Sequence, residues 1–168
     1  MANPKIEIRV KNYGTMTAEL YPDMAPVTVA NFLKLAKDEF FNGLIFHRVI
    51  PGFMIQGGGY TPDFANKEAD AITGEFKSNG FAQNTLKHTR GVLSMARTMD
   101  PNSASSQFFV MHRDAPHLDG QYAAFGKLTD GFDVLDKIAE TRTGSLGFYM
   151  QDVPKETVEI ETIAVTEE

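Results

Sequence analysis

Residues 46–58 place two short apolar runs on either side of a Pro-Gly pair. The runs have the length of strands, and Pro51-Gly52 is typical of a tight turn, so the stretch predicts a β-hairpin. Residues 5–11 alternate charged and apolar side chains, which indicates another strand with one buried face. Both patterns favour a fold built mainly from β-strands.

One arginine lies among the large hydrophobic residues of this hairpin. Because side chains alternate along a strand, we expect Phe46 and Arg48 to share one face of the first strand. Met54 and Gln56 should share a face of the second strand, with Phe53 beside them at the turn. A guanidinium, a thioether and an amide would then meet on one surface. The alternative is a solvated Arg48 on a half-buried hairpin, with Met54 as ordinary core.

Three motifs in the hairpin resemble the active-site signature of the cyclophilins, the cyclosporin-binding family of peptidyl-prolyl cis-trans isomerases. They are FHR at residues 46–48, PGFM at 51–54 and QGG at 56–58. The resemblance continues in GVLSMA at 91–96, SQFF at 106–109 and FGK at 125–127. It implies a mainly β fold: a closed eight-stranded antiparallel barrel capped by two α-helices, with a binding groove on its outer wall.

The hydrophobic pattern fits two helices. Pro26 suits a first helical position, because its missing N–H would have no partner there. One buried stripe follows at helical spacing: Val29, Phe32, Leu33 and Ala36. Asp130 is predicted to cap a second helix, which buries Phe132, Leu135 and Ala139.

The remaining segments are interpreted as strands and loops of a single domain, residues 1–168. Strands are predicted at 91–96, 107–111 and 122–127, and a last strand at 157–165. The last strand changes phase, so a β-bulge is expected near residues 161–162. Residues 57–90 and the segment up to Lys155 are expected to be loops.

Composition excludes several classes of protein. The chain has no cysteine, which excludes disulfides and thiolate metal sites, and its formal charge of −6 argues against an electrostatic grip on nucleic acid or anionic lipid. The four histidines lack the spacing of a metal site, so neither metal nor cofactor is expected. No apolar run has the length of a membrane span, and the first residues lack a secretory signal pattern. We expect a cytoplasmic monomer.

The isomerase reaction breaks no covalent bond. Twisting an X-Pro amide disrupts C–N resonance and has a barrier of ~18–20 kcal/mol, so the catalyst must bind the twisted amide better than either planar form. The prolyl nitrogen regains a lone pair on twisting, and Arg48 can donate a hydrogen bond to it. Gln56 can orient the guanidinium or bind the substrate backbone.

The resemblance also assigns the substrate-binding residues. Phe53, Met54, Phe109 and Leu118 would form the apolar pocket for the proline ring, while Ala96 and Gln107 would contact the chain that precedes the proline. His47, His117 and Tyr122 complete the set. The expected partners are proline-containing peptides and folding proteins.

Two positions depart from the family pattern. Many cyclophilins have a tryptophan, which binds cyclosporin, where this chain has His117, and a histidine near the proline pocket where it has Tyr122. We therefore expect isomerase activity with weakened affinity for cyclosporin.

The main competing interpretation is a non-catalytic proline-peptide-binding module or chaperone that uses the same groove. The presence of Arg48 disfavours it, because a protein that only binds peptides could lose this residue. A serine hydrolase is poorly supported, since Ser94 lies in a predicted strand without a nucleophile elbow.

Overall fold

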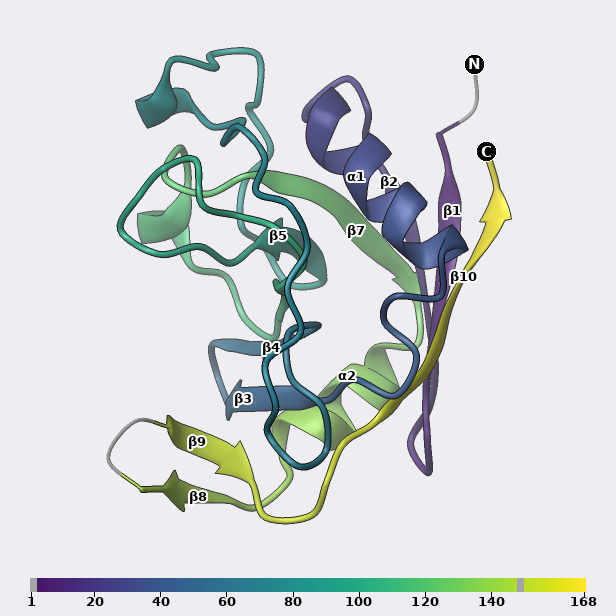
Figure 1. Cartoon of the computed structure of the whole chain (residues 1–168). Coiled ribbons are helices and arrows are strands. Elements are labelled where there is room, and N and C mark those ends of the chain that lie inside the picture. Colours follow the sequence, from purple (N-terminus) through teal and green to yellow (C-terminus); the bar gives the residue numbers. More distant parts are fainter. Residues whose placement is uncertain (1–2, 148–149) are drawn as a thin grey trace.

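The computed structural model describes residues 3–147 and 150–168. Its main element is a curled antiparallel sheet of eight strands in the order β10-β1-β2-β7-β5-β6-β4-β3 (Figure 1). The strands are β1 (Lys5–Val10), β2 (Gly14–Leu20), β3 (Phe46–Ile50), β4 (Met54–Gly57), β5 (Val92–Met95), β6 (Phe108–Met111), β7 (Ala124–Asp130) and β10 (Ile160–Glu167). The predicted mainly β fold is confirmed.

The two edges of this sheet approach each other through single contacts. Ile45 and Glu159 form an isolated antiparallel bridge, and the Phe46 N–H donates to the Val158 carbonyl at 2.9 Å. Ile45, Val158 and Glu159 precede β3 and β10, and Phe46 is the first residue of β3. The barrel is therefore completed by a bridge, without a full ladder between β3 and β10, and "closed" slightly overstates it.

Two α-helices lie at opposite ends of the curled sheet, α1 (Pro26–Lys37) and α2 (Phe132–Ala139) (Figure 1). The first begins at Pro26 as predicted, and its buried face also includes Leu35. The predicted Asp130 cap is wrong. Asp130 ends β7, and the N-cap of α2 is Gly131, with φ of +87° and no side-chain cap hydrogen bond. A Cβ at Gly131 would lie 2.5 Å from the Thr15 carbonyl oxygen, so this close approach requires glycine.

The predicted loop before Lys155 contains a second, two-stranded sheet, β8 (Thr143–Leu146) and β9 (Met150–Pro154). The prediction of a loop was wrong there, because these short strands bury only Val153 and Pro154 and lack a regular apolar alternation. The loop expected at 57–90 carries the 3₁₀ turn η1 (Lys77–Asn79) and an isolated bridge between Tyr60 and Asn66. A second 3₁₀ turn, η2 (Pro116–Leu118), lies between β6 and β7.

Among the register shifts between the strands, two bear on the predictions. At the predicted bulge in β10, Val10 pairs with Ile160 and Arg9 with Thr162, which leaves Glu161 as the extra residue. A bulge that was not predicted lies in β3. Phe46 pairs with Gly57 and Arg48 with Gln56, so two steps along β3 match one step along β4.

The bulge in β3 overturns one prediction. Phe46 and Arg48 do not share a face: Phe46 is fully buried in the barrel interior, whereas Arg48 is exposed on the outer wall. Met54 and Gln56 do share the outer face, because β4 keeps its regular alternation.

Aromatic rings fill the barrel interior. Phe32 of α1 packs against Phe41, Phe108 and Phe125 with ring centroids 5.0–5.3 Å apart. The neighbour of Phe108 on β6, Phe109, points the other way and joins a smaller cluster under the outer wall. This second cluster contains Met54, Val92, Phe109, Met111, Ala115, Leu118 and Ala124.

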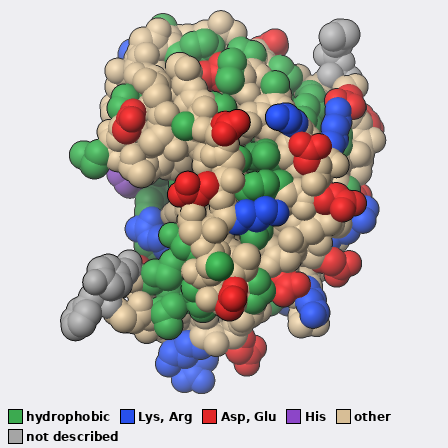
Figure 2. Space-filling view, in the orientation of Figure 1, with side chains coloured by type: hydrophobic (Ala, Val, Ile, Leu, Met, Phe, Trp, Pro, Cys, Tyr) green, Lys and Arg blue, Asp and Glu red, His purple; other side chains and the backbone are tan. Residues whose placement is uncertain are grey.

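The surface shows mixed charge. On the face in Figure 2, the acidic and basic side chains drawn in colour are interspersed, so this face has no extended field of one sign. Among the described residues, no helix has the length and apolar character needed to cross a membrane.

Candidate active site

A pocket opens on the outer wall above the smaller apolar cluster. Its lining residues come from β3, β4 and β6, from the turn between β3 and β4, and from the loops that follow β5 and β6. This outer-wall pocket is lined by Arg48, Phe53, Met54, Gln56, Ala96, Arg97, Phe109, Leu118 and Tyr122. Counted together with the open solvent at its mouth, the volume of the pocket is about 450 Å³.

The floor of the outer-wall pocket is apolar and rigidly supported. Met54, Phe109 and Leu118 are all buried, and the ring of Tyr122 meets Phe109 edge-on at 5.8 Å. Beneath the floor, His88 stacks on Phe109 with ring centroids 6.0 Å apart. Such a floor favours a compact apolar group such as a proline ring.

His88 is itself fixed by its hydrogen bonds. Its Nε2 lies 2.8 Å from the Ser94 hydroxyl, and its Nδ1 lies 3.1 Å from Asp119 Oδ1. Burial lowers the pKa of His88, although Asp119 acts in the opposite direction. Ser94 is fully buried, so this serine, histidine and aspartate support the floor and present no accessible nucleophile.

Polar groups line one side of the pocket mouth. Arg48 Nη1 donates to Gln56 Oε1 at 3.2 Å, and Gln56 Nε2 donates to Gln107 Oε1 at 3.0 Å. The guanidinium thus lies beside the apolar floor and is oriented by an amide. It also remains accessible to solvent in the free chain, so a ligand must cover it to remove water.

Arg97 is a lining residue that sequence reasoning missed. Its guanidinium lies between the rings of Phe76 and Tyr122, 4.7 Å from each centroid. It donates to the Gln121 carbonyl at 2.7 Å and to the Thr98 carbonyl at 3.0 Å. Arg97 therefore joins the loop after β5 to the loop that carries Tyr122, and both loops border the pocket.

Three predicted site residues lie outside the outer-wall pocket. His47 is buried behind it, with its ring 4.6 Å from that of Tyr60, and burial followed by the nearby Arg48 charge lowers its pKa to about 4. Gln107 contacts the site through Gln56 and lines a neighbouring hollow that it shares with Ala96. His117 stacks on Phe53 at 6.0 Å and lines an open hollow beside Tyr122.

No metal site is apparent in residues 3–147 and 150–168, where no group of three or more histidine or acidic side chains converges. The residues that line the pocket offer hydrogen bonding and apolar contact. Both are suited to binding a polypeptide segment without covalent change.

Comparisons with known proteins agree with this geometry. The model of the family described as cyclophilin type peptidyl-prolyl cis-trans isomerase/CLD matches residues 5–165. A peptidyl-prolyl cis-trans isomerase of Acinetobacter baylyi is 44% identical over 98% of this chain and 87% of its own length. Peptidyl-prolyl cis-trans isomerase B of Escherichia coli is 45% identical over 93% of this chain and 96% of its own length.

The similarity extends to solved structures. The crystal structure of a Cryptosporidium parvum cyclophilin type isomerase matches with a TM-score of 0.80 and 30% identity, covering 99% of both chains. A structure of that enzyme in the presence of the dipeptide Ala-Pro matches with a TM-score of 0.78. The chain belongs to the cyclophilin-type peptidyl-prolyl cis-trans isomerases and is an enzyme of that type.

Proposed function

We propose that this isomerase accelerates rotation about X-Pro bonds in folding proteins, with Arg48 stabilising the twisted amide. One observation carries the proposal: the guanidinium of Arg48 lies at the mouth of an apolar pocket and is oriented there by Gln56 at 3.2 Å. A proline ring on the floor formed by Met54, Phe109 and Leu118 would bring its own nitrogen towards that guanidinium.

Arginine suits this role because it stays protonated at physiological pH and carries five donors in a planar fork. In the planar amide the nitrogen lone pair is delocalised and accepts no hydrogen bond, whereas in the twisted amide it does. The interaction is therefore stronger in the transition state than in either ground state, as catalysis requires.

One hydrogen bond does not supply the whole effect. A preorganised donor in a water-poor site contributes ~3–4 kcal/mol, whereas a rate gain of about 10⁵ needs about 7 kcal/mol. Because Arg48 is exposed in the free chain, its contribution depends on the substrate covering it. The remainder comes from removing water around the amide and from contacts of Ala96 and Gln107 with the residues that precede the proline, which hold the backbone part-rotated.

The ligand class is proline-containing peptide. The related Cryptosporidium parvum enzyme was crystallised in the presence of the dipeptide Ala-Pro, which supports this ligand class. Non-catalytic peptide binding would use the same floor and would not need Arg48. The two functions are therefore separated by the effect of Arg48 on rate.

The decisive experiment compares Arg48→Ala with Arg48→Lys in an assay of proline isomerisation in a short peptide, together with peptide binding. We expect Arg48→Ala to lower the rate constant by about 10²–10³-fold with little loss of affinity, and Arg48→Lys to lie between, since it retains charge without the fork. Arg9→Ala, an exposed arginine on β1, is the matched control. An Arg48→Ala protein as active as Arg9→Ala would leave the peptide-binding module or chaperone as the better description.

We further propose that cyclosporin binds weakly, because an imidazole at position 117 offers less apolar surface than the indole present in many cyclophilins. His117 is exposed and stacks on Phe53, so the side chain is available at the rim of the pocket. His117→Trp should tighten inhibition by cyclosporin while leaving isomerisation of a short peptide nearly unchanged. Inhibition of the unaltered chain as tight as that of a tryptophan-bearing relative would contradict the proposal.

A further inference from the structure

The Phe53 side of the outer-wall pocket rests on a tight turn. Phe53 N–H donates to the Ile50 carbonyl at 3.0 Å, with Pro51 and Gly52 at the central positions and Gly52 at φ of +80°. These are the features of a type II turn. The turn's own hydrogen bond uses Phe53 N–H, so the Gly52 N–H is free to bond outside it.

His112 accepts that free donor. The Gly52 N–H donates to His112 Nδ1 at 2.8 Å, and the Phe53 carbonyl accepts from the backbone N–H of His112 at 2.9 Å. The Pro51–Gly52 and Phe53–Met54 peptide groups, which enclose the Gly52-Phe53 pair, are thus both bonded to one residue. The position of the Phe53 ring therefore depends on His112.

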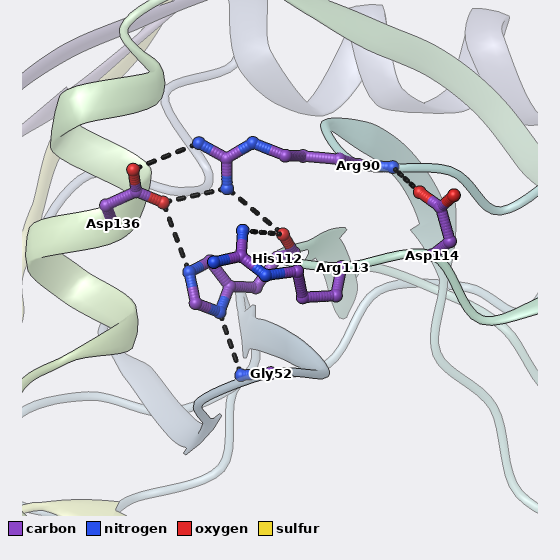
Figure 3. A network of polar contacts seen from close by, with 6 residues as sticks. All are labelled: Gly52, Arg90, His112, Arg113, Asp114 and Asp136. Carbon is purple, nitrogen blue, oxygen red and sulfur yellow. Dashed lines mark hydrogen bonds and ion pairs between the residues drawn. The ribbon is translucent and has the colours of Figure 1, made fainter.

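The contact with Gly52 determines the protonation of the imidazole ring. A backbone N–H can only donate, so His112 Nδ1 must be the acceptor and carries no proton. The ring proton then lies on Nε2, which donates to Asp136 Oδ1 at 3.1 Å (Figure 3). His112 is buried, and both of its ring nitrogens are paired.

Asp136 of α2 is fixed in turn by Arg90. The guanidinium donates to both carboxylate oxygens, at 2.8 and 3.0 Å, and also to the His112 carbonyl at 3.1 Å (Figure 3). The hydrogen bond from Arg90 lowers the pKa of Asp136, which therefore stays ionised as an acceptor for the imidazole. Such bidentate pairs restrict the geometry of both partners.

We propose that His112 is a positioning residue for the isomerase reaction, which fixes Phe53 against the substrate through a single neutral tautomer maintained by Asp136 and Arg90. Helix α2 thereby supports one wall of a pocket that none of its own residues line. The proposal rests on the proposed function only in taking the outer-wall pocket as the site of the proline ring.

The expected kinetic effect is specific. Phe53 contacts the ring in the planar and twisted states alike, so loosening it should weaken binding without lowering the maximal rate. Asp136→Ala and His112→Ala should each weaken peptide affinity roughly fivefold, about 1 kcal/mol, with kcat nearly unchanged. His112→Gln should restore most of the affinity, because its amide oxygen can accept from Gly52 while its NH₂ donates to Asp136.

Asp133→Ala is the matched control, since it removes the same charge from an exposed position on the same helix. We expect it to leave peptide affinity unchanged. Equal effects of Asp133→Ala and Asp136→Ala would overturn the proposal, as would a fall in kcat without a change in affinity. All of these variants retain Arg48. A failure of this proposal can therefore be distinguished from a failure of the role proposed for Arg48 in catalysis.

A measurement on the unaltered protein keeps the proposal testable even where His112→Ala fails to fold. Nitrogen NMR of the imidazole should show an unprotonated Nδ1 and a protonated Nε2, and the Gly52 amide should exchange slowly with solvent. In Asp136→Ala the Gly52 amide should exchange faster. A ring protonated on Nδ1, or one that samples both tautomers, would overturn the proposal.

Discussion

Gln56 lies directly opposite Arg48 in the β3–β4 ladder, and its Oε1 accepts a hydrogen bond from Arg48 Nη1 at 3.2 Å. The other end of the same amide donates to Gln107 at 3.0 Å. Gln56 thus orients the Arg48 guanidinium, and Gln107, which immediately precedes β6, orients Gln56. This arrangement preorganises an otherwise exposed arginine.

Removing the amide should therefore impair catalysis more than binding. We expect Gln56→Leu to lower kcat about tenfold, because a guanidinium free to rotate loses part of the stabilisation that a fixed donor provides. Gln107→Ala should have a smaller effect, since Arg48 retains its contact with Gln56. Isomerisation rates and peptide binding measured on both variants check this expectation. A Gln56→Leu enzyme with normal kcat and weakened binding would assign Gln56 to the substrate backbone instead.

The sequence was sufficient to predict the hairpin and most of the pocket. Regular alternation along β4 placed Met54 and Gln56 on one face correctly. The family resemblance assigned Phe109, Leu118 and Tyr122 to the proline pocket, and all three line the outer-wall pocket. Alternation failed in β3, because a bulge adds one residue and turns Phe46 inward while Arg48 faces the pocket. A bulge inside five residues leaves too few positions for a change of phase to be recognised.

Arg97 was missed for a different physical reason. A charged residue at the start of a polar loop is normally solvated, and nothing local shows that it will be covered by aromatic rings. Its partners, Phe76 and Tyr122, are distant in sequence and meet it only through the fold. The Arg90–Asp136–His112 network is likewise formed from three separate segments, so sequence pattern alone could not assemble it.

Arg97 should strengthen the binding of a proline peptide by holding Tyr122 in place at the pocket. Because the guanidinium stacks on Phe76 and Tyr122 and donates to two carbonyls, Arg97→Ala should release the loops on either side and weaken peptide affinity by about three- to tenfold, which corresponds to roughly 1 kcal/mol of stacking. Arg97→Lys should recover little, since an ammonium cannot make the planar stack. Binding titrations with a proline peptide test this. Full affinity in Arg97→Ala would show that the loops are held by other contacts.

The rate of isomerisation should vary little between about pH 6 and 9, because arginine does not titrate in that range. His47, the histidine next to Arg48, has its pKa lowered to about 4 by burial and therefore stays neutral throughout this interval. Peptide isomerisation measured across the range, at constant ionic strength, tests the expectation. A bell-shaped profile would indicate a general acid or base and would count against the role proposed for Arg48.

Stability, in contrast, should depend on pH through His47. Its pKa falls from 6.5 to about 4 on folding, so between these values the unfolded chain binds more protons and stability decreases as the solution is acidified. The full effect, reached below about pH 4, is about 3 kcal/mol. His47→Phe, which preserves an aromatic contact with Tyr60, should show a shallower loss of unfolding free energy between about pH 6.5 and 4. His117→Phe changes an exposed histidine and is the control; the same slope in the His47 and His117 variants would exclude His47 as the source.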